Sequence, residues 1–263
     1  MGTLPKVRSY SPMKIYLACT AGLKKEFNNG LVRPEDIYVL ESFYTIADWQ
    51  KGLLNRFKGF LLDSGAFTFL NSVKSTKNAD FERYADSYAD FIKTYKIKRY
   101  FELDIDKIVG LQETERLRKR IEQRSGVPCI PVWHKYRGKE YFESMCKEYD
   151  YVAIGGIVTK EIPKELYERM FPWFINTAHK HNTMIHGLGY TDTKKLHKFR
   201  FDSVDSSTWT CGRRYGEAAW FKDGIILRRK AKQNGLKIKD TTSINWFSFN
   251  QWIKMQKYAE LKL

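Results

Sequence analysis

The sequence predicts an α/β protein, and two observations favour a (β/α)8 barrel within that class. Short apolar runs alternate with longer amphipathic stretches between residues 14 and 206, and eight such runs occur. Each run is continuously apolar, which is typical of parallel strands covered by helices. Eight strand–helix units match a closed barrel, whereas the alternative, a doubly wound open sheet, usually has about six strands.

The elements can be placed in order along the chain. The expected strands are 14–18, 37–43, 59–67, 99–106, 127–134, 151–157, 183–189 and 200–206. Apolar residues at helical spacing predict helices over 81–92, 111–123, 192–199 and 246–261, with another after Pro163. Asn78 or Asp80 could cap the first of these helices, and proline is tolerated in a first helical turn.

The charge balance indicates the class of partner. Lys and Arg number 46 against 30 Asp and Glu, a net charge of +16, which favours a polyanion such as nucleic acid or an anionic membrane surface. No run approaches the roughly 18 apolar residues of a membrane span, and the first residues lack the apolar segment of a secretory signal. We therefore expect a soluble cytoplasmic protein that does not bind membranes.

One domain over residues 1–263 is expected, with the barrel over about 14–210 and a basic extension over about 211–263.

The cysteines are scattered without a C-x-x-C pair, which excludes a zinc ribbon and favours buried reduced thiols; they are Cys19, Cys129, Cys146 and Cys211. Three histidines lack ligand spacing and are expected to face solvent, namely His179, His181 and His197.

The extension carries cations interleaved with Trp220 and Phe221, a combination typical of phosphate-backbone binding. Asp223-Gly224 within it predicts a hairpin turn. A solvated surface without a partner is the alternative interpretation. The residues expected to contact nucleic acid are Arg213, Arg214, Lys222, Arg228, Arg229 and Lys230.

Carboxylates gather at the predicted carboxyl ends of the strands, where barrel enzymes place their active sites. They are Asp63, Asp104, Asp106, Asp202 and Asp205. Any one of them could instead cap a helix. Together they permit two chemistries: a hard-cation site that includes Asp104-x-Asp106, or glycosidic catalysis in which Asp63 and Asp205 flank the bond.

Other residues at these ends would suit a planar base. Gly65 and Gly155-Gly156 would let the backbone approach a flat ligand, and three rings, Phe67, Trp133 and His186, could stack on it. Glycosidic chemistry on a nucleotide is therefore plausible from the residues alone.

Six short motifs, in the order of the strands, resemble those of the tRNA-guanine transglycosylases. They are LDSGAF at 62–67, LDI at 103–105, IGGI at 154–157, HGLG at 186–189, FDSVD at 201–205 and the segment 213–224, which is similar to the R-x-G…A…DG hairpin. Each motif is short, and the ordered set covers about residues 59–227.

The resemblance implies an enzyme that exchanges guanine in a polynucleotide for a 7-deazaguanine, without a metal or cofactor. By position, Asp205 would be the nucleophile on C1′ and Asp63 the general acid and base. Asp104 would bind the Watson–Crick edge of the base. The other implied base contacts are Ser64, Gly65, Phe67, Gly155, Gly156, His186 and one of Trp133 or His134.

The sequence departs from the tRNA enzymes in three places. The family's zinc site, C-x-C-x-x-C with a histidine, is missing. LPTR is replaced by residues 207–211 (STWTC), and VQGG by residues 132–135 (VWHK). A compact, zinc-free, basic chain resembles the 7-deazaguanine DNA transglycosylases of the DpdA type from bacteriophages and bacteria, which would act in the host cytoplasm if phage-encoded.

We therefore expect DNA to be the polymer and a preQ0-like base to be the small substrate. The alternatives are the same exchange on tRNA, a catalytically silent barrel that binds nucleic acid, and metal-dependent hydrolysis through Asp104 and Asp106.

Overall fold

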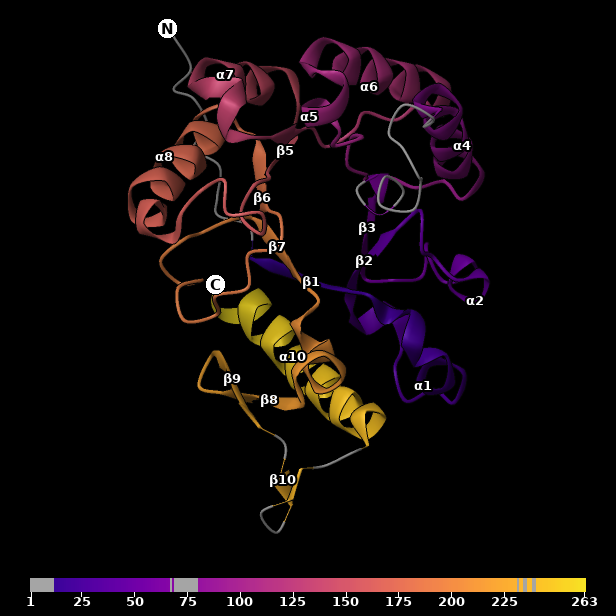
Figure 1. Cartoon of the computed structure of the whole chain (residues 1–263), viewed down its shortest axis with the longest axis vertical. Coiled ribbons are helices and arrows are strands. Elements are labelled where there is room, and N and C mark those ends of the chain that lie inside the picture. The colour runs from indigo at the N-terminus through magenta and orange to yellow at the C-terminus, as the bar shows by residue number, and fades with distance from the viewer. Residues whose placement is uncertain (1–11, 67, 69–79, 231, 234–235, 238–239) are drawn as a thin grey trace, which may run out of the picture. The chain divides into compact units, whose positions relative to one another are not determined.

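The computed structural model describes residues 12–66, 68, 80–230, 232–233, 236–237 and 240–263 (Figure 1). The chain is mixed α/β and divides into two compact units, Ala18–Val132 and a second made of Met1–Leu17 with Trp133–Leu263. The sequence contains no linker that marks this division. Phe67, expected to stack on a base, lies outside the described residues.

The Ala18–Val132 unit is built on parallel strands. Strand β2 (Tyr38–Ser42) pairs in parallel with β3 (Gly59–Asp63), and isolated parallel bridges continue from Leu62 to Tyr100 and from Phe101 to Ile130. The expected strand over 99–106 is therefore reduced to bridges. Its second half turns instead, since the amide of Ile105 donates to the carbonyl of Leu103 at 3.0 Å.

Helices α4 and α6 of this unit lie side by side in Figure 1 and are joined by exposed ion pairs, such as Arg120 with Asp86 at 2.7 Å. Asp80 caps α4 by accepting from the amide of Arg83 at 2.9 Å, which confirms one of the two expected caps. The helices are η1 (Thr20–Leu23), α1 (Lys24–Asn28), η2 (Pro34–Asp36), α2 (Asp48–Lys51), α4 (Phe81–Thr94), α5 (Asp106–Val109) and α6 (Leu111–Ser125).

The second unit also contains a parallel sheet, in which neighbouring strands follow the order β1, β7, β6, β5. Their bounds are Lys14–Ala18 for β1, Ser203–Ser206 for β7, Met184–Gly187 for β6 and Tyr151–Ile154 for β5; β4 is Val132–Trp133. Side chains alternate across such strands. Tyr16, His186, Ser203 and Asp205 therefore share one face, because Tyr16 pairs with Asp205 and His186 with Ser203.

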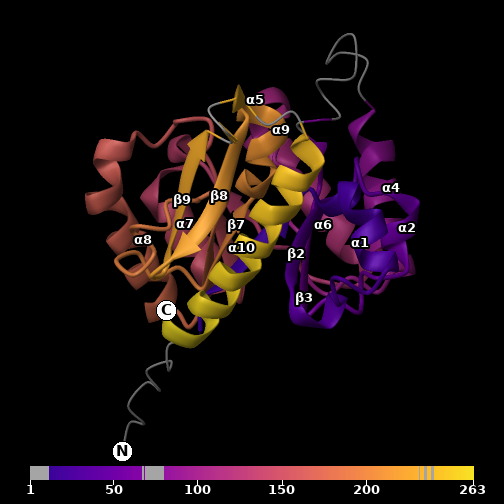
Figure 2. The ribbon, with the colours of Figure 1, turned by 90° about the horizontal axis from the view of Figure 1, so that it is seen from below.

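A hairpin follows this sheet, as expected. Asp223 and Gly224 both have positive φ, 49° and 82°, which is the conformation of a two-residue hairpin turn. The hairpin lies against the last helix in Figures 1 and 2, and side chains of that helix accept from its amides: Ser248 from Ala219 at 3.0 Å and Gln251 from Phe221 at 3.2 Å.

The remaining elements of this unit are η4 (Lys135–Arg137), α7 (Gly138–Glu148), η5 (Lys164–Leu166), α8 (Tyr167–Lys180), η6 (Thr208–Thr210), α9 (Cys211–Tyr215), β8 (Glu217–Lys222), β9 (Ile225–Lys230), β10 (Lys232–Gln233), β11 (Leu236–Lys237) and α10 (Thr241–Lys262). The helix expected over 192–199 is wrong, since that segment forms turns. Among the described residues, none of the helices has both the length and the apolar character that a membrane crossing requires.

All four cysteines are free thiols. Three are buried as expected: Cys129, Cys146 and Cys211. Cys19 is exposed, which corrects the expectation for that residue.

Candidate functional site

The hydrogen bonds of Asp205, in the second unit, hold one oxygen of its carboxylate and leave the other without a partner among the described residues. It is the third of the four residues of β7, and 14% of its side chain is exposed. Its Oδ1 accepts from the amide of Gly189 at 2.6 Å and lies 3.2 Å from Nε2 of His186. Within the described part of the chain, Oδ2 accepts no hydrogen bond. One oxygen is therefore held in place and the other is open to react.

A chain of hydrogen bonds holds His186. Its Nδ1 is bonded to the hydroxyl of Ser203, which in turn is bonded to the hydroxyl of Tyr151. If the neutral ring donates from Nε2 to Asp205, then Nδ1 must accept, so Ser203 donates to His186 and Tyr151 donates to Ser203. With this tautomer every hydrogen bond of the chain has a donor and an acceptor, and His186 presents a proton to Asp205.

The position of His186 differs from the expectation that it stacks on a base. Its side chain is fully buried, and it meets the rings of Tyr16 and Tyr151 edge-on at 6.2 and 6.5 Å. No face of the ring is open to a ligand, so the structure gives His186 a role in positioning Asp205. The sequence did contain a signal for Ser203, because residues i and i+2 of a strand share a face.

Trp133 is likewise a core residue and not a base contact. It is 2% exposed, its Nε1 donates to the carbonyl of Gly138 at 2.6 Å, and its ring lies 4.5 Å from that of Phe174. Of the two alternatives, Trp133 or His134, only His134 keeps a polar group near the strand end. Nδ1 of His134 pairs with Oε2 of Glu161 at 3.0 Å.

Glu161 also explains one glycine of the pair Gly155-Gly156, which follows β5. A Cβ on Gly156 would lie 2.9 Å from Cβ of Glu161, and Gly156 has a φ of +75°. The amide of Gly155 donates to the carbonyl of Trp133 at 2.8 Å. The glycine at 156 therefore makes room for a side chain of the protein itself, a constraint that sequence analysis missed.

In the Ala18–Val132 unit, Asp63 ends β3 and is half-buried. Two tyrosines of α4 secure the backbone beside it: Tyr84 donates to the carbonyl of Ser64 at 2.6 Å, and Tyr88 to that of Leu62 at 3.1 Å. Burial raises the pKa of both tyrosines above the ordinary value, and the nearby charge of Asp63 raises the pKa of both further. Both phenols are therefore neutral donors beside this carboxylate.

Ser64 and Gly65 are fixed by packing. Ser64 is 2% exposed, and Gly65 has a φ of +68°. A Cβ on Gly65 would lie 2.6 Å from Cβ of Tyr44, so the close approach that requires glycine is to the segment after β2.

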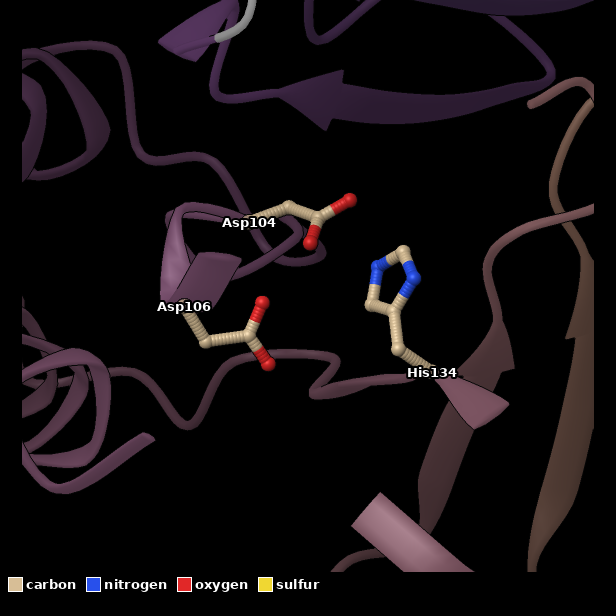
Figure 3. A group of neighbouring side chains, drawn as sticks. All are labelled: Asp104, Asp106 and His134. Atoms are coloured by element: carbon tan, nitrogen blue, oxygen red, sulfur yellow. The ribbon is translucent and has the colours of Figure 1, made fainter. Parts of the chain in front are cut away.

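Asp104 and Asp106 flank the start of α5 (Figure 3). Asp106 is 5% exposed, and oxygens of the two carboxylates lie within 4.8 Å of each other. Such a pair can supply part of a hard-cation site. Figure 3 also labels His134, which follows β4 in the second unit.

Glu102, two residues before Asp104, is a buried carboxylate that the sequence analysis missed. It accepts from the amide of Val132 at 2.7 Å and pairs with Arg118 at 3.3 Å, so its role is structural.

The six cations expected to bind nucleic acid are all exposed: Arg213, Arg214, Lys222, Arg228, Arg229 and Lys230. The guanidinium of Arg229 lies 5.3 Å from the ring centre of Trp220, a cation–π contact. Lys230 donates to the carbonyl of Tyr215 at 2.9 Å and lies 3.5 Å from Glu217. These contacts orient cations along the hairpin and α9.

Comparison with known proteins gives no family. No family model matches the sequence, and no curated protein matches it. Among solved structures, the chain is similar to "QR15, an Aldolase", with a TM-score of 0.47 and 13% identity over 78% of this chain and 93% of that one.

It is also similar to the carboxyl transferase domain of Rhizobium etli pyruvate carboxylase. The TM-scores are 0.43 with 3-bromopyruvate and 0.44 with oxalate, at 12% and 13% identity, over 94% of this chain and 48% of those chains. Scores and identities this low carry no argument about the fold or the activity.

Proposed function

We propose that this protein is a glycosyltransferase that exchanges guanine in DNA for a preQ0-like 7-deazaguanine, on a (β/α)8 barrel. The observation that carries the proposal is that one carboxylate oxygen of Asp205 is oriented by hydrogen bonds while the other accepts none from the described residues. A carboxylate that attacks carbon needs one unencumbered oxygen and a fixed orientation. Gly189 and His186 supply the orientation through Oδ1, and Oδ2 accepts no hydrogen bond from the described residues.

In the proposed reaction, Oδ2 of Asp205 attacks C1′ and the bond between C1′ and guanine N9 breaks. Asp63 gives its proton to the departing guanine, which leaves a covalent ester between Asp205 and the sugar. The incoming 7-deazaguanine then loses its N9 proton to Asp63 and attacks C1′, which releases Asp205. Two inversions retain the configuration at C1′, and neither step needs a metal or a cofactor.

Recognition of the base is assigned to the carboxylate oxygens of Asp104. The target base must leave its stack to reach these groups, so the substrate is single-stranded or flipped DNA. The exposed cations of the hairpin and α9 would hold the phosphate backbone. The same chemistry on tRNA is the alternative, and the proposed location is the cytoplasm, or the host cytoplasm for a phage protein.

A second candidate function rests on the closeness of Asp104 and Asp106. Metal-dependent hydrolysis of nucleic acid would use these oxygens to bind the cation, and EDTA would abolish it.

The proposal is tested by exchange of radiolabelled guanine into duplex DNA, single-stranded DNA and bulk tRNA, with EDTA present, followed by the same assay with preQ0 as competitor. We expect label to enter DNA and to be chased out by preQ0. Label in tRNA alone would overturn the choice of polymer. Cleavage of the polymer that disappears with EDTA would favour hydrolysis. If neither guanine nor preQ0 were exchanged in any polymer, the protein would be one that binds nucleic acid without catalysis.

A further inference from the structure

A cavity of about 370 Å³ lies within the second unit, next to the loop that holds Asp205. Its walls come from the loop after β6, the segment before α8 and strand β9. Four of the lining side chains are cationic and one is a carboxylate: Lys164, Lys194, Lys195, Arg228 and Asp192. Of these five residues, only Arg228 was expected from the sequence to contact a ligand.

The acidic groups near the cavity do not cancel its charge. Asp192 is the single carboxylate among the residues that line the cavity, against four cations. Lys195 pairs with Glu168 at 3.0 Å. Arg228 lies 3.9 Å from Glu217. The exposed Lys164, Lys194 and Arg228 still outnumber Asp192 in the lining, so the cavity has an excess of positive charge. Such an excess favours an anionic ligand.

The loop and the hairpin are physically joined at this cavity. The amide of Ile226 on β9 donates to the hydroxyl of Thr193 at 2.9 Å, and both residues line the cavity. The guanidinium from the hairpin and the ammonium groups from the loop are therefore held around the same space.

Gly189 connects the cavity to the reacting group. It lines the cavity, and its amide donates to Oδ1 of Asp205. A polynucleotide carries one phosphate for each nucleotide, so a sugar placed at Asp205 has phosphates within one nucleotide on either side. The cationic cavity that borders Gly189 is where such a phosphate would lie.

We propose that this cavity binds a backbone phosphodiester adjacent to the nucleotide whose sugar Asp205 attacks. The proposal rests on the proposed function for its choice of ligand. It adds Lys164 and Lys194 to the nucleic-acid contacts and places them beside the reacting sugar. By holding one phosphate there, they would determine which nucleotide faces Asp205.

The test compares two double variants with equal loss of charge. Lys164→Gln with Lys194→Gln removes two cations from the cavity, whereas Lys180→Gln with Lys254→Gln removes two exposed cations outside it. Binding of a fluorescein-labelled single-stranded DNA oligonucleotide is followed by anisotropy over a series of salt concentrations. Thermal melting establishes that all variants fold.

We expect the cavity variant to bind about tenfold more weakly at low salt and its salt slope to fall by about 0.7 for each lost phosphate contact. The control should stay within about twofold of the wild type, a bound set by general charge effects. Equal losses in both variants, or an unchanged slope in the cavity variant, would overturn the subsite. Because no turnover is measured, a failure of base exchange would be seen separately, in the radiolabel assay.

Discussion

Two histidine–aspartate pairs lie at opposite ends of β7, and they use nearly the same contacts. Asp202, just before the strand, pairs with Nε2 of His179 at 3.0 Å and accepts from the amide of Ile185 at 2.8 Å. Asp205, near its end, lies 3.2 Å from Nε2 of His186 and accepts from the amide of Gly189 at 2.6 Å. A list of contacts alone would give both aspartates the same role.

The difference lies in where each histidine comes from. His179 is in the last turn of α8, so its pair with Asp202 ties that helix to the sheet. His186 is on β6, and Ser203 and Tyr151 hold its other nitrogen. Ligands of parallel α/β sheets bind at the carboxyl ends of the strands, which is the end that Asp205 occupies. We infer that the first pair stabilises the fold and the second serves the reaction.

The largest effect is expected from Asp205→Asn. The amide cannot act as a nucleophile on C1′, so base exchange should fall by at least about a thousandfold. DNA affinity measured by anisotropy should remain within about threefold of the wild type, because a single carboxylate that faces the sugar contributes little to backbone binding. Retained turnover would remove Asp205 as the nucleophile.

The matched change at the other end of β7, Asp202→Asn, should show the opposite pattern. It weakens a buried pair with His179 and places an amide group where an acceptor is needed. The free energy of unfolding in urea should fall by about 1–3 kcal/mol. Exchange per folded molecule should be unchanged. If activity fell as far as in Asp205→Asn, the distinction between the two pairs would be lost.

A smaller effect is expected from Ser203→Ala, which releases Nδ1 of His186 and so loosens Asp205. We expect kcat to fall about 10–100-fold with KM within about twofold, as for a misplaced reacting group. Ser203→Thr keeps the hydroxyl and should restore kcat. Equal losses in the alanine and threonine variants would indicate a packing defect and not a positioning role.

The smallest effect concerns a buried carboxyl group that has no histidine partner. Oε1 of Glu41 accepts from the amide of Thr20 at 2.6 Å and from Gln50 at 2.9 Å, and burial raises its pKa above 4.5. The folded state therefore favours the neutral form, and its contribution to stability is lost as the pH rises from 4.5 through the raised pKa.

Glu41→Gln keeps an acceptor and cannot ionise. Urea unfolding from pH 4.5 to about 8 should therefore show a flatter pH dependence in the variant than in the wild type. Identical slopes would mean that Glu41 ionises as easily in the folded as in the unfolded chain.

Local features were predictable from the sequence, and side-chain partners were not. The strand over 14–18 and the turn at Asp223-Gly224 were confirmed, because each depends on a short local pattern. The helix over 192–199 was wrong for a local reason too. The backbone bonds there span three residues, from Lys195 to Asp192 and from Lys198 to Lys195, so the segment forms successive turns.

The candidate site shows more clearly that side-chain partners could not be predicted from the sequence. Sequence analysis placed Asp205 at a strand end, yet it took the buried rings of Trp133 and His186 for base contacts. Trp133 packs on Phe174 and His186 is bonded to Ser203, and both of these partners lie more than fifteen residues away along the chain. His179, expected at the surface, found its partner in Asp202 for the same reason.

The pairing of β1 with β7 has a consequence for the order of synthesis. Lys14 pairs with Ser203, and the carbonyl of Ile15 accepts from Gln256 of the last helix at 2.6 Å. At about 5–20 residues per second, a ribosome needs roughly 10–40 s to reach β7 after it has made β1. The Ala18–Val132 unit comes from one continuous stretch and can finish folding during that wait. Strand β1 therefore stays without its partner β7 until that later part of the chain has been made, and a chaperone that shields apolar segments could bind it during that time.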